Sequence, residues 1–174
     1  MRNPSPSLAE HACLVLVVQG ATHGWVIGSA LQPDGELGRV FTLSRPLTYR
    51  AIDGLVDKKW VTRKETAGPG RDRAELRPTA AGRRVAQAWL DTPVGHVRDV
   101  RVELMLKLLL RERGGQSNAP LLTAQLDAIP FERLTEQLGG DVVDLWRREQ
   151  ARSVQSFLRS ALAASEGRRE TRSR

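Results

Sequence analysis

The chain has 174 residues and a mass of 19.3 kDa, enough for one ordinary domain or two small ones. Hydrophobic residues make up 40% of it and charged residues 27%, a balance that permits a packed core and argues against wholesale disorder. The longest apolar runs, residues 12–18 and 108–110, fall far short of the roughly 20 residues that a membrane-spanning helix needs. We therefore expect a cytoplasmic protein with no membrane span.

Positive charge is concentrated in one part of the chain. The net charge is +7, from 27 Lys and Arg against 20 Asp and Glu. Residues 44–84 hold eleven bases and five acids, whereas residues 91–164 hold ten of each. All but four of the bases are arginine, which suits phosphates and base edges, although a GC-rich coding bias explains that preference equally well. The localised surplus predicts a surface for a polyanion.

The amino-terminal elements are expected to be short. Ser7 with Glu10 three residues later forms a capping-box pattern, which predicts a helix up to about residue 18 that Gly20 ends. A second short helix is expected over residues 23–31, and a short strand over residues 39–43.

A third helix is marked more clearly, over residues 44–58. Ser44 is a plausible cap, and Pro46 stands in the first turn, where a missing N–H costs nothing. Helical periodicity divides it into two sides. The apolar side holds Thr48, Ala51, Ile52 and Leu55, and the other side holds Pro46, Tyr49, Arg50, Asp53 and Asp57.

A β-hairpin and a fourth helix are expected next. The extended runs 60–66 and 73–77 flank a turn rich in Gly and Pro, and Thr79 then caps a helix up to residue 90. The order of three helices, a hairpin and a helix within about 85 residues is that of a winged helix-turn-helix. This arrangement would bring both basic segments to a duplex. The expected DNA contacts are Ser44, Arg45, Tyr49, Arg50, Arg63, Lys64, Arg71 and Arg73.

The carboxy-terminal half reads as helical. A very apolar helix is expected over residues 95–113, then a helix over residues 120–138 that Pro130 kinks or breaks, and a last helix over residues 141–164. The fold class predicted is mainly α with a small β-wing. It comprises a DNA-binding winged helix domain over residues 7–90, a helical dimerisation domain over residues 94–164 and a disordered basic tail over residues 165–174.

Several motifs resemble the PadR family of transcriptional regulators. They are His23-Gly24-Trp25, residues 43–55 (LSRPLTYRAIDGL), and Arg73 followed by residues 79–82 (TAAG). Residues 93–108 resemble the helical region of the family's longer members. The resemblance implies that Tyr49 is the family's recognition-helix tyrosine and Arg73 its wing arginine. The chain departs from the family at three positions, with Lys59 for a usual Gly, Leu76 for an aromatic residue and Pro78 for Leu.

The resemblance also implies a homodimer, built from the carboxy-terminal region and the first helix. A single winged helix makes few base contacts, so such proteins usually pair on two half-sites. The helix over residues 95–113 is apolar almost all round, and we expect part of it to face a partner. The expected dimerisation residues are Leu16, Val100, Leu104, Leu108, Trp146, Val154 and Phe157.

Together these patterns predict a sequence-specific repressor that binds operator DNA as a homodimer and is released by a small hydrophobic or aromatic effector. The alternative is a winged-helix adaptor that binds proteins and no specific DNA. No residue constellation suggests an enzyme, a cofactor or a metal site, because the three histidines lie far apart. Trp25, Trp60 and Trp89 are expected in the core, and Cys13 is expected to be a buried small hydrophobe.

Overall fold

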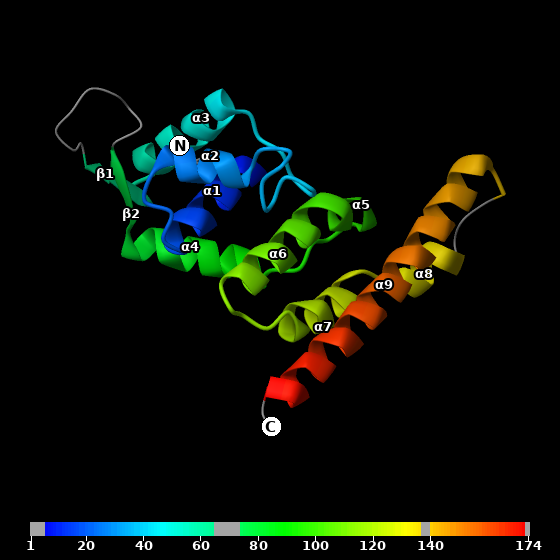
Figure 1. Ribbon diagram of the computed structural model, residues 1–174. Coiled ribbons are helices and arrows are strands. Elements are labelled where there is room, and N and C mark those ends of the chain that lie inside the picture. The colour runs from blue at the N-terminus through cyan, green and yellow to red at the C-terminus, as the bar shows by residue number, and fades with distance from the viewer. Residues whose placement is uncertain (1–5, 65–73, 137–139, 173–174) are drawn as a thin grey trace. The chain divides into compact units, whose positions relative to one another are not determined.

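The computed structural model describes residues 6–64, 74–136 and 140–172 (Figure 1). The chain forms two compact units, Met1–Leu90 and Asp91–Arg174. The described residues are mainly helical, with one two-stranded antiparallel sheet, so the predicted mainly α class with a small β-wing is confirmed. The elements of the first unit are α1 (Leu8–Val18), α2 (Gly24–Ala30), α3 (Arg45–Asp57), β1 (Val61–Lys64), β2 (Glu75–Pro78) and α4 (Ala80–Asp91).

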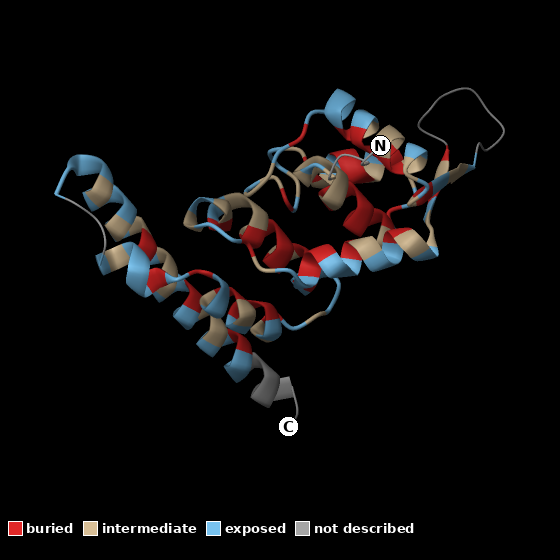
Figure 2. Cartoon of the chain, turned by 180° about the vertical axis from the view of Figure 1, so that it is seen from behind, coloured by how far each residue is buried: buried red, intermediate tan, exposed pale blue. Residues whose placement is uncertain are grey.

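Helix α1 lies at the centre of the first unit. The capping box is present as predicted, with the Ser7 side chain accepting from the Glu10 N–H and the Glu10 side chain accepting from the Ser7 N–H. Residues 12–17 are all buried, as the coloured view shows (Figure 2). The helix ends at Val18, and Gly20 follows with a φ of 99°, a left-handed conformation that glycine adopts without strain.

The expected strand over residues 39–43 is wrong, because this segment forms turns and irregular backbone. Its surroundings explain the difference. The N–H of Leu43 donates to the carbonyl of Leu31 at 2.9 Å, and the Gln32 side chain donates to the carbonyl of Leu43 at 3.0 Å. The end of α2 therefore supplies the partners that a neighbouring strand would have provided.

Helix α3 buries the side that its periodicity predicts, Thr48, Ala51, Ile52 and Leu55. Ser44 precedes it as expected but makes no capping bond through its side chain. The exit of the helix is unusual. The N–H of Lys59 donates to Val56 and that of Trp60 to Leu55, so Lys59 occupies the position where helices usually place glycine. Its φ is 58°, a left-handed value for a residue that has a Cβ.

The hairpin and α4 follow the predicted order. Strand β1 pairs antiparallel with β2, with Val61 opposite Pro78 and Lys64 opposite Glu75. The Thr79 hydroxyl accepts from the N–H of Gly82 at 3.0 Å, which confirms it as the cap of α4. Helix α3 packs against β1, and α1 packs against β2, so the sheet is anchored to the helices along both strands.

The second unit is built entirely of helices within its described residues. They are α5 (Val97–Asp99), the π-helical turn η2 (Val100–Leu104), α6 (Met105–Arg113), α7 (Ala119–Ala128), α8 (Phe131–Glu136) and α9 (Val142–Arg172). The chain breaks between α7 and α8 at Pro130, as predicted. Helix α9 continues through Arg172, so the expectation of a tail without regular structure is wrong for residues 165–172. This stretch has no proline and contains three Arg and two Glu, which favour helix.

Buried polar side chains hold the start of the second unit in place. The Gln125 amide both donates to the carbonyl of Val94 and accepts from its N–H, each at 2.8 Å. Lys107 donates to the carbonyl of Thr92, and Arg111 pairs with Asp91. Because these donors come from α6 and α7, residues 91–94 are bound to the helices of the second unit.

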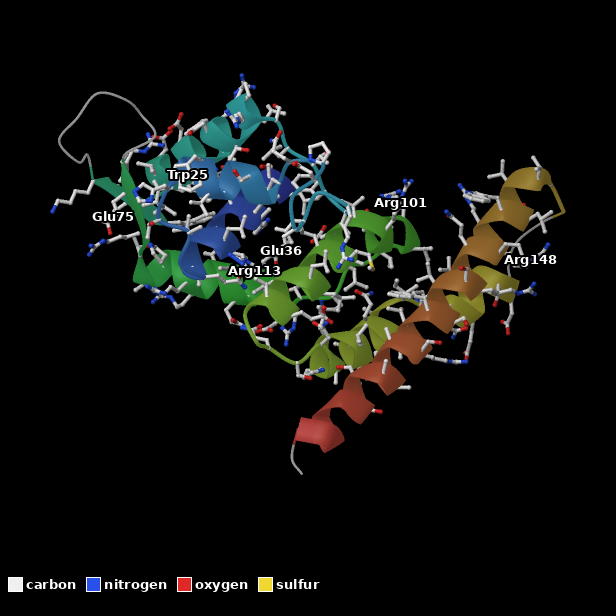
Figure 3. All side chains as sticks on the ribbon, viewed as in Figure 1. Trp25, Glu36, Glu75, Arg101, Arg113 and Arg148 are labelled. Carbon is white, nitrogen blue, oxygen red and sulfur yellow. The ribbon has the colours of Figure 1, made fainter. Side chains whose placement is uncertain are left out.

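The burial of the tryptophans and of the cysteine was predicted only in part. Trp89 is buried and its ring stacks on that of His11 at 4.8 Å between centroids, and Trp60 is half-buried. Trp25 was expected in the core, but this is wrong, since it is 57% exposed (Figure 3). Cys13 is buried as expected, and burial raises the pKa of its thiol to about 12, which keeps it protonated.

The strained exit of α3 yields a stability prediction. We expect Lys59→Gly to stabilise the protein by about 0.5–1 kcal/mol, because relief of the left-handed strain outweighs the added freedom of the unfolded chain. Urea denaturation followed by circular dichroism measures the change. Lys59→Ala is the matched control, since it removes the same charge and keeps the Cβ. A lower urea midpoint for the glycine variant than for the alanine variant would contradict the prediction.

Candidate nucleic-acid interface

The outer side of α3 carries cations without an internal partner. Arg45 and Arg50 are exposed, and neither forms an ion pair with another described residue. Ser44 is exposed at the start of the helix, and Tyr49 is half-buried beside Arg50. These four predicted contacts therefore share one helix, and the two arginines project from it into solvent.

Tyr49 is positioned by the glycine of the His-Gly-Trp motif. A Cβ on Gly24 would lie only 2.6 Å from the Cε1 of the Tyr49 ring, so the ring packs directly on the Gly24 backbone. The hydroxyl of Thr22 and the Nδ1 of His23 lie 2.8 Å apart just before it. The backbone of Gly24 at the start of α2 thus provides a flat surface against which the Tyr49 side chain of α3 packs.

The two predicted contacts on β1 point in opposite directions. Side chains alternate along a strand, so Arg63 shares the side of buried Val61, and Lys64 shares the side of exposed Thr62. Arg63 Nη2 lies 2.6 Å from Asp53 Oδ1 on α3, whereas Lys64 forms no ion pair with a described residue. Lys64 is exposed, while Arg63 links the hairpin to α3.

The outer side of the hairpin holds a cation that the sequence reasoning missed. Arg77 lies opposite Thr62 and is exposed, and its guanidinium donates to both carboxylate oxygens of Glu75 at 3.0 and 3.2 Å. Glu75 lies on the hairpin in the side-chain view (Figure 3). Strand alternation counted from the apolar Leu76 would have found Arg77. The predicted contacts Arg71 and Arg73 lie outside the described residues.

An ion pair beneath α3 joins its end to α1. Lys58 forms a salt bridge with Glu10, and both side chains are largely buried. Burial alone raises the pKa of Glu10, but the hydrogen bonds from Lys58 and the Ser7 N–H, together with the Lys58 charge, outweigh it. The pKa of Glu10 is therefore lowered from its usual value. The pair fixes the end of α3 against the centre of the first unit.

The predicted dimerisation residues fall into two groups. Leu16, Val100, Leu104 and Leu108 are buried. The last three belong to the core of the second unit, among side chains of α7, α8 and α9. Val154 is half-buried against the same core, and only Phe157 and Trp146 are exposed, Trp146 by 63%. The start of α9 also exposes Val142, Val143 and Leu145.

No protein-family profile and no curated protein matches the chain. Among solved structures it is similar to two of Bacillus subtilis PadR. The one in complex with operator DNA is 21% identical, with 91% of this chain and 99% of that chain covered and a TM-score of 0.47. The one in complex with p-coumaric acid is 20% identical, with 92% and 99% covered and a TM-score of 0.45. Among the described residues, no helix combines the length and apolar character needed to cross a bilayer.

The packing of Tyr49 on Gly24 can be tested directly. We expect Gly24→Ala to displace the aromatic ring, because the new methyl group would overlap it. Tyr49 is the only tyrosine of the chain, so its ring signals in a carbon-13 labelled sample report the displacement without assignment. Gly28→Ala in the same helix is the control, since a Cβ there meets no atom within 4 Å. Equal shifts in both variants would contradict the packing.

The Glu10–Lys58 pair predicts a pH dependence of stability. A carboxylate whose pKa is lowered on folding stabilises the protein fully above its unfolded pKa of about 4.3 and loses that contribution as the pH falls through the folded value. We expect the difference in free energy of unfolding between wild type and Glu10→Gln to shrink from pH 6 to pH 3. Lys58→Gln should flatten the pH profile similarly. A difference that stayed constant over this range would show that the pair contributes nothing through charge.

Proposed function

We propose that this chain is a sequence-specific, DNA-binding transcriptional regulator. In this proposal it binds operator DNA as a homodimer, acts as a repressor in the cytoplasm and is released by a small hydrophobic or aromatic effector. The first unit, over residues 7–90, would bind the duplex, and the second, over residues 94–164, would provide the dimer contact and the response to the effector.

One observation carries the DNA-binding part. Exposed cations without an ion-pair partner among the described residues, Arg45, Arg50 and Lys64, come from the outer sides of α3 and β1, and these two elements pack together. A helix with a polar outer side fits the major groove, where arginine donors recognise guanine, and a hairpin beside it reaches phosphates. Ser44 and Tyr49 would complete the contacts of α3, and Arg63, Arg71 and Arg73 those of the hairpin.

The exposed apolar start of α9 supports the dimer. Large apolar side chains in one exposed cluster are typical of protein contacts, and Trp146 and Phe157 lie on the same helix. A second copy would bury them and would place two copies of α3 on two half-sites of one duplex. Val100, Leu104, Leu108 and Val154 would support this contact from the core of the second unit, and Leu16 would contribute through α1.

The partner classes in the PadR complexes, operator DNA and an aromatic acid, are extended to this chain only as part of the proposal. A change of effector occupancy in the second unit would alter the spacing of the paired recognition helices. Titration of candidate aromatic acids against a protein–duplex complex tests this part. If no aromatic acid changed the affinity of the intact dimer for the duplex, the effector part of the proposal would be refuted.

Selection of duplexes from a random-sequence pool tests the DNA-binding part, with affinities then measured at several salt concentrations. We expect Arg50→Ala to weaken the preferred duplex by about 1–3 kcal/mol and to relax the preference at one position. Lys64→Ala and Arg71→Ala should instead weaken all duplexes alike and reduce the salt slope by about one unit each. A wild-type protein that selects no sequence would refute the proposal.

The dimer contact has its own prediction, and the two exposed tryptophans provide a matched pair. We expect Trp146→Ser to shift the chain from dimer to monomer, because it removes the largest exposed apolar side chain of α9. Trp25→Ser removes a similar area from the first unit and should leave the dimer intact. Sedimentation equilibrium distinguishes the two. Monomerisation by both variants, or by neither, would argue against a contact centred on α9.

A protein–protein adaptor is the second candidate, and Trp25 favours it. An exposed tryptophan is typical of a protein contact, and 57% exposure is high for a side chain of that size. An adaptor would bind DNA weakly and without sequence preference, and Trp25→Ser would abolish capture of its partner. The sequence selection described above separates this candidate from the regulator.

A further inference from the structure

The cationic outer side of α3 also carries acids, and Asp53 is the one that lies beside Tyr49 and Arg50. Asp53 follows Arg50 by three residues and Tyr49 by four, so it lies on the same side of the helix. A carboxylate at this place opposes the phosphates of a duplex unless a cation offsets its charge. The acid therefore needs a specific reason to be compatible with a DNA-binding surface.

Arg63 supplies the offsetting charge from the neighbouring strand. Its Nη2 lies 2.6 Å from Asp53 Oδ1, and the two side chains are 26% and 42% exposed. A single guanidinium nitrogen makes this bond, so the remaining N–H groups can still donate to a phosphate. Strand alternation already turns Arg63 toward α3, and the carboxylate fixes the end of a side chain that would otherwise move freely.

We propose that Asp53 is a positioning residue that holds Arg63 in one orientation and thereby sets the sequence discrimination of the hairpin. The inference rests on the proposed DNA binding. A mobile arginine reaches the phosphates of any duplex. A guanidinium held by Asp53 stays in one place, so it contacts a phosphate only if the DNA backbone passes that place. The path of the backbone depends on the base sequence, so the held arginine favours some sequences over others.

Asp57 provides the control, because it lies one turn further along the same helix. It is exposed and forms no ion pair with another described residue. Asp57→Asn and Asp53→Asn remove the same charge from the same side of α3. The pair of variants therefore separates a general electrostatic effect from the loss of a held arginine.

The measured quantity is the ratio of affinities for the preferred duplex, selected by the wild type, and a scrambled duplex of equal length. For Asp57→Asn we expect both affinities to rise by the same factor of about two to five, with the ratio unchanged. For Asp53→Asn the affinity for the scrambled duplex should rise by the same factor while that for the preferred duplex does not, so the ratio falls about two- to fivefold.

A charge swap distinguishes positioning from stability. Asp53→Arg alone should lower the thermal midpoint, because it places two guanidinium groups together. Adding Arg63→Asp restores an ion pair at the same place and should recover the midpoint. The affinity ratio should stay low, because the guanidinium now belongs to α3 and not to the hairpin.

Equal ratios for Asp53→Asn and Asp57→Asn, or recovery of the ratio by the charge swap, would overturn the inference while leaving the proposed function intact. A wild-type protein without any preferred duplex would overturn both.

Discussion

Helix α1 has no exposed side along most of its length, and the first unit is organised by that constraint. Successive residues of a helix point about 100° apart, so six buried residues in a row require cover from several directions. Helices α2 and α3 and strand β2 all contact α1. Helix α3 therefore buries one side, with Thr48, Ala51, Ile52 and Leu55, inside the unit, and only its opposite side is left for a partner.

Ion pairs decide how much positive charge that remaining side presents. Lys58 is neutralised by Glu10, Arg63 by Asp53 and Arg77 by Glu75. The number of bases counted from the sequence is thus larger than the number of cations that have no ion pair among the described residues. Two of the three pairs join different elements, so the same contacts that reduce the charge also hold α3 against α1 and β1. On this surface, the ion pairs that lower the positive charge also hold the elements rigidly together.

Local patterns were predictable from the sequence. The Ser7–Glu10 capping box, the buried side of α3, the break at Pro130 and the cap at Thr79 depend on residues close together in the chain. Features that depend on distant partners were not. The segment over residues 39–43 lacks a strand because residues at the end of α2 supply its hydrogen bonds, and the hydrophobicity of Trp25 does not reveal that it stays 57% exposed. The packing of Tyr49 on Gly24 joins α3 to α2, and these two helices meet only in the folded structure.

The candidate site also has features that the sequence predicts and features that it does not. Residue type and helical spacing identified Arg45, Tyr49 and Arg50 as members of one outer side. They did not reveal that Arg63 and Lys64, adjacent in the chain, have opposite environments, because that depends on which side of β1 meets α3. The predicted dimerisation residues show a similar division, since apolar character alone does not separate Leu104, inside the second unit, from Trp146 on its surface.

The π-helical turn over residues 100–104 has a consequence for how this protein can vary. Such a turn accommodates one residue more than an α-helix over the same rise. Val100, Leu104 and Leu108, spaced by four, would drift around a regular helix, yet all three reach one core. Loss of a single residue here would convert the turn to ordinary helix and leave the helical segments on both sides in register. The turn is therefore a place where homologues can differ in length without disturbing the helices that follow.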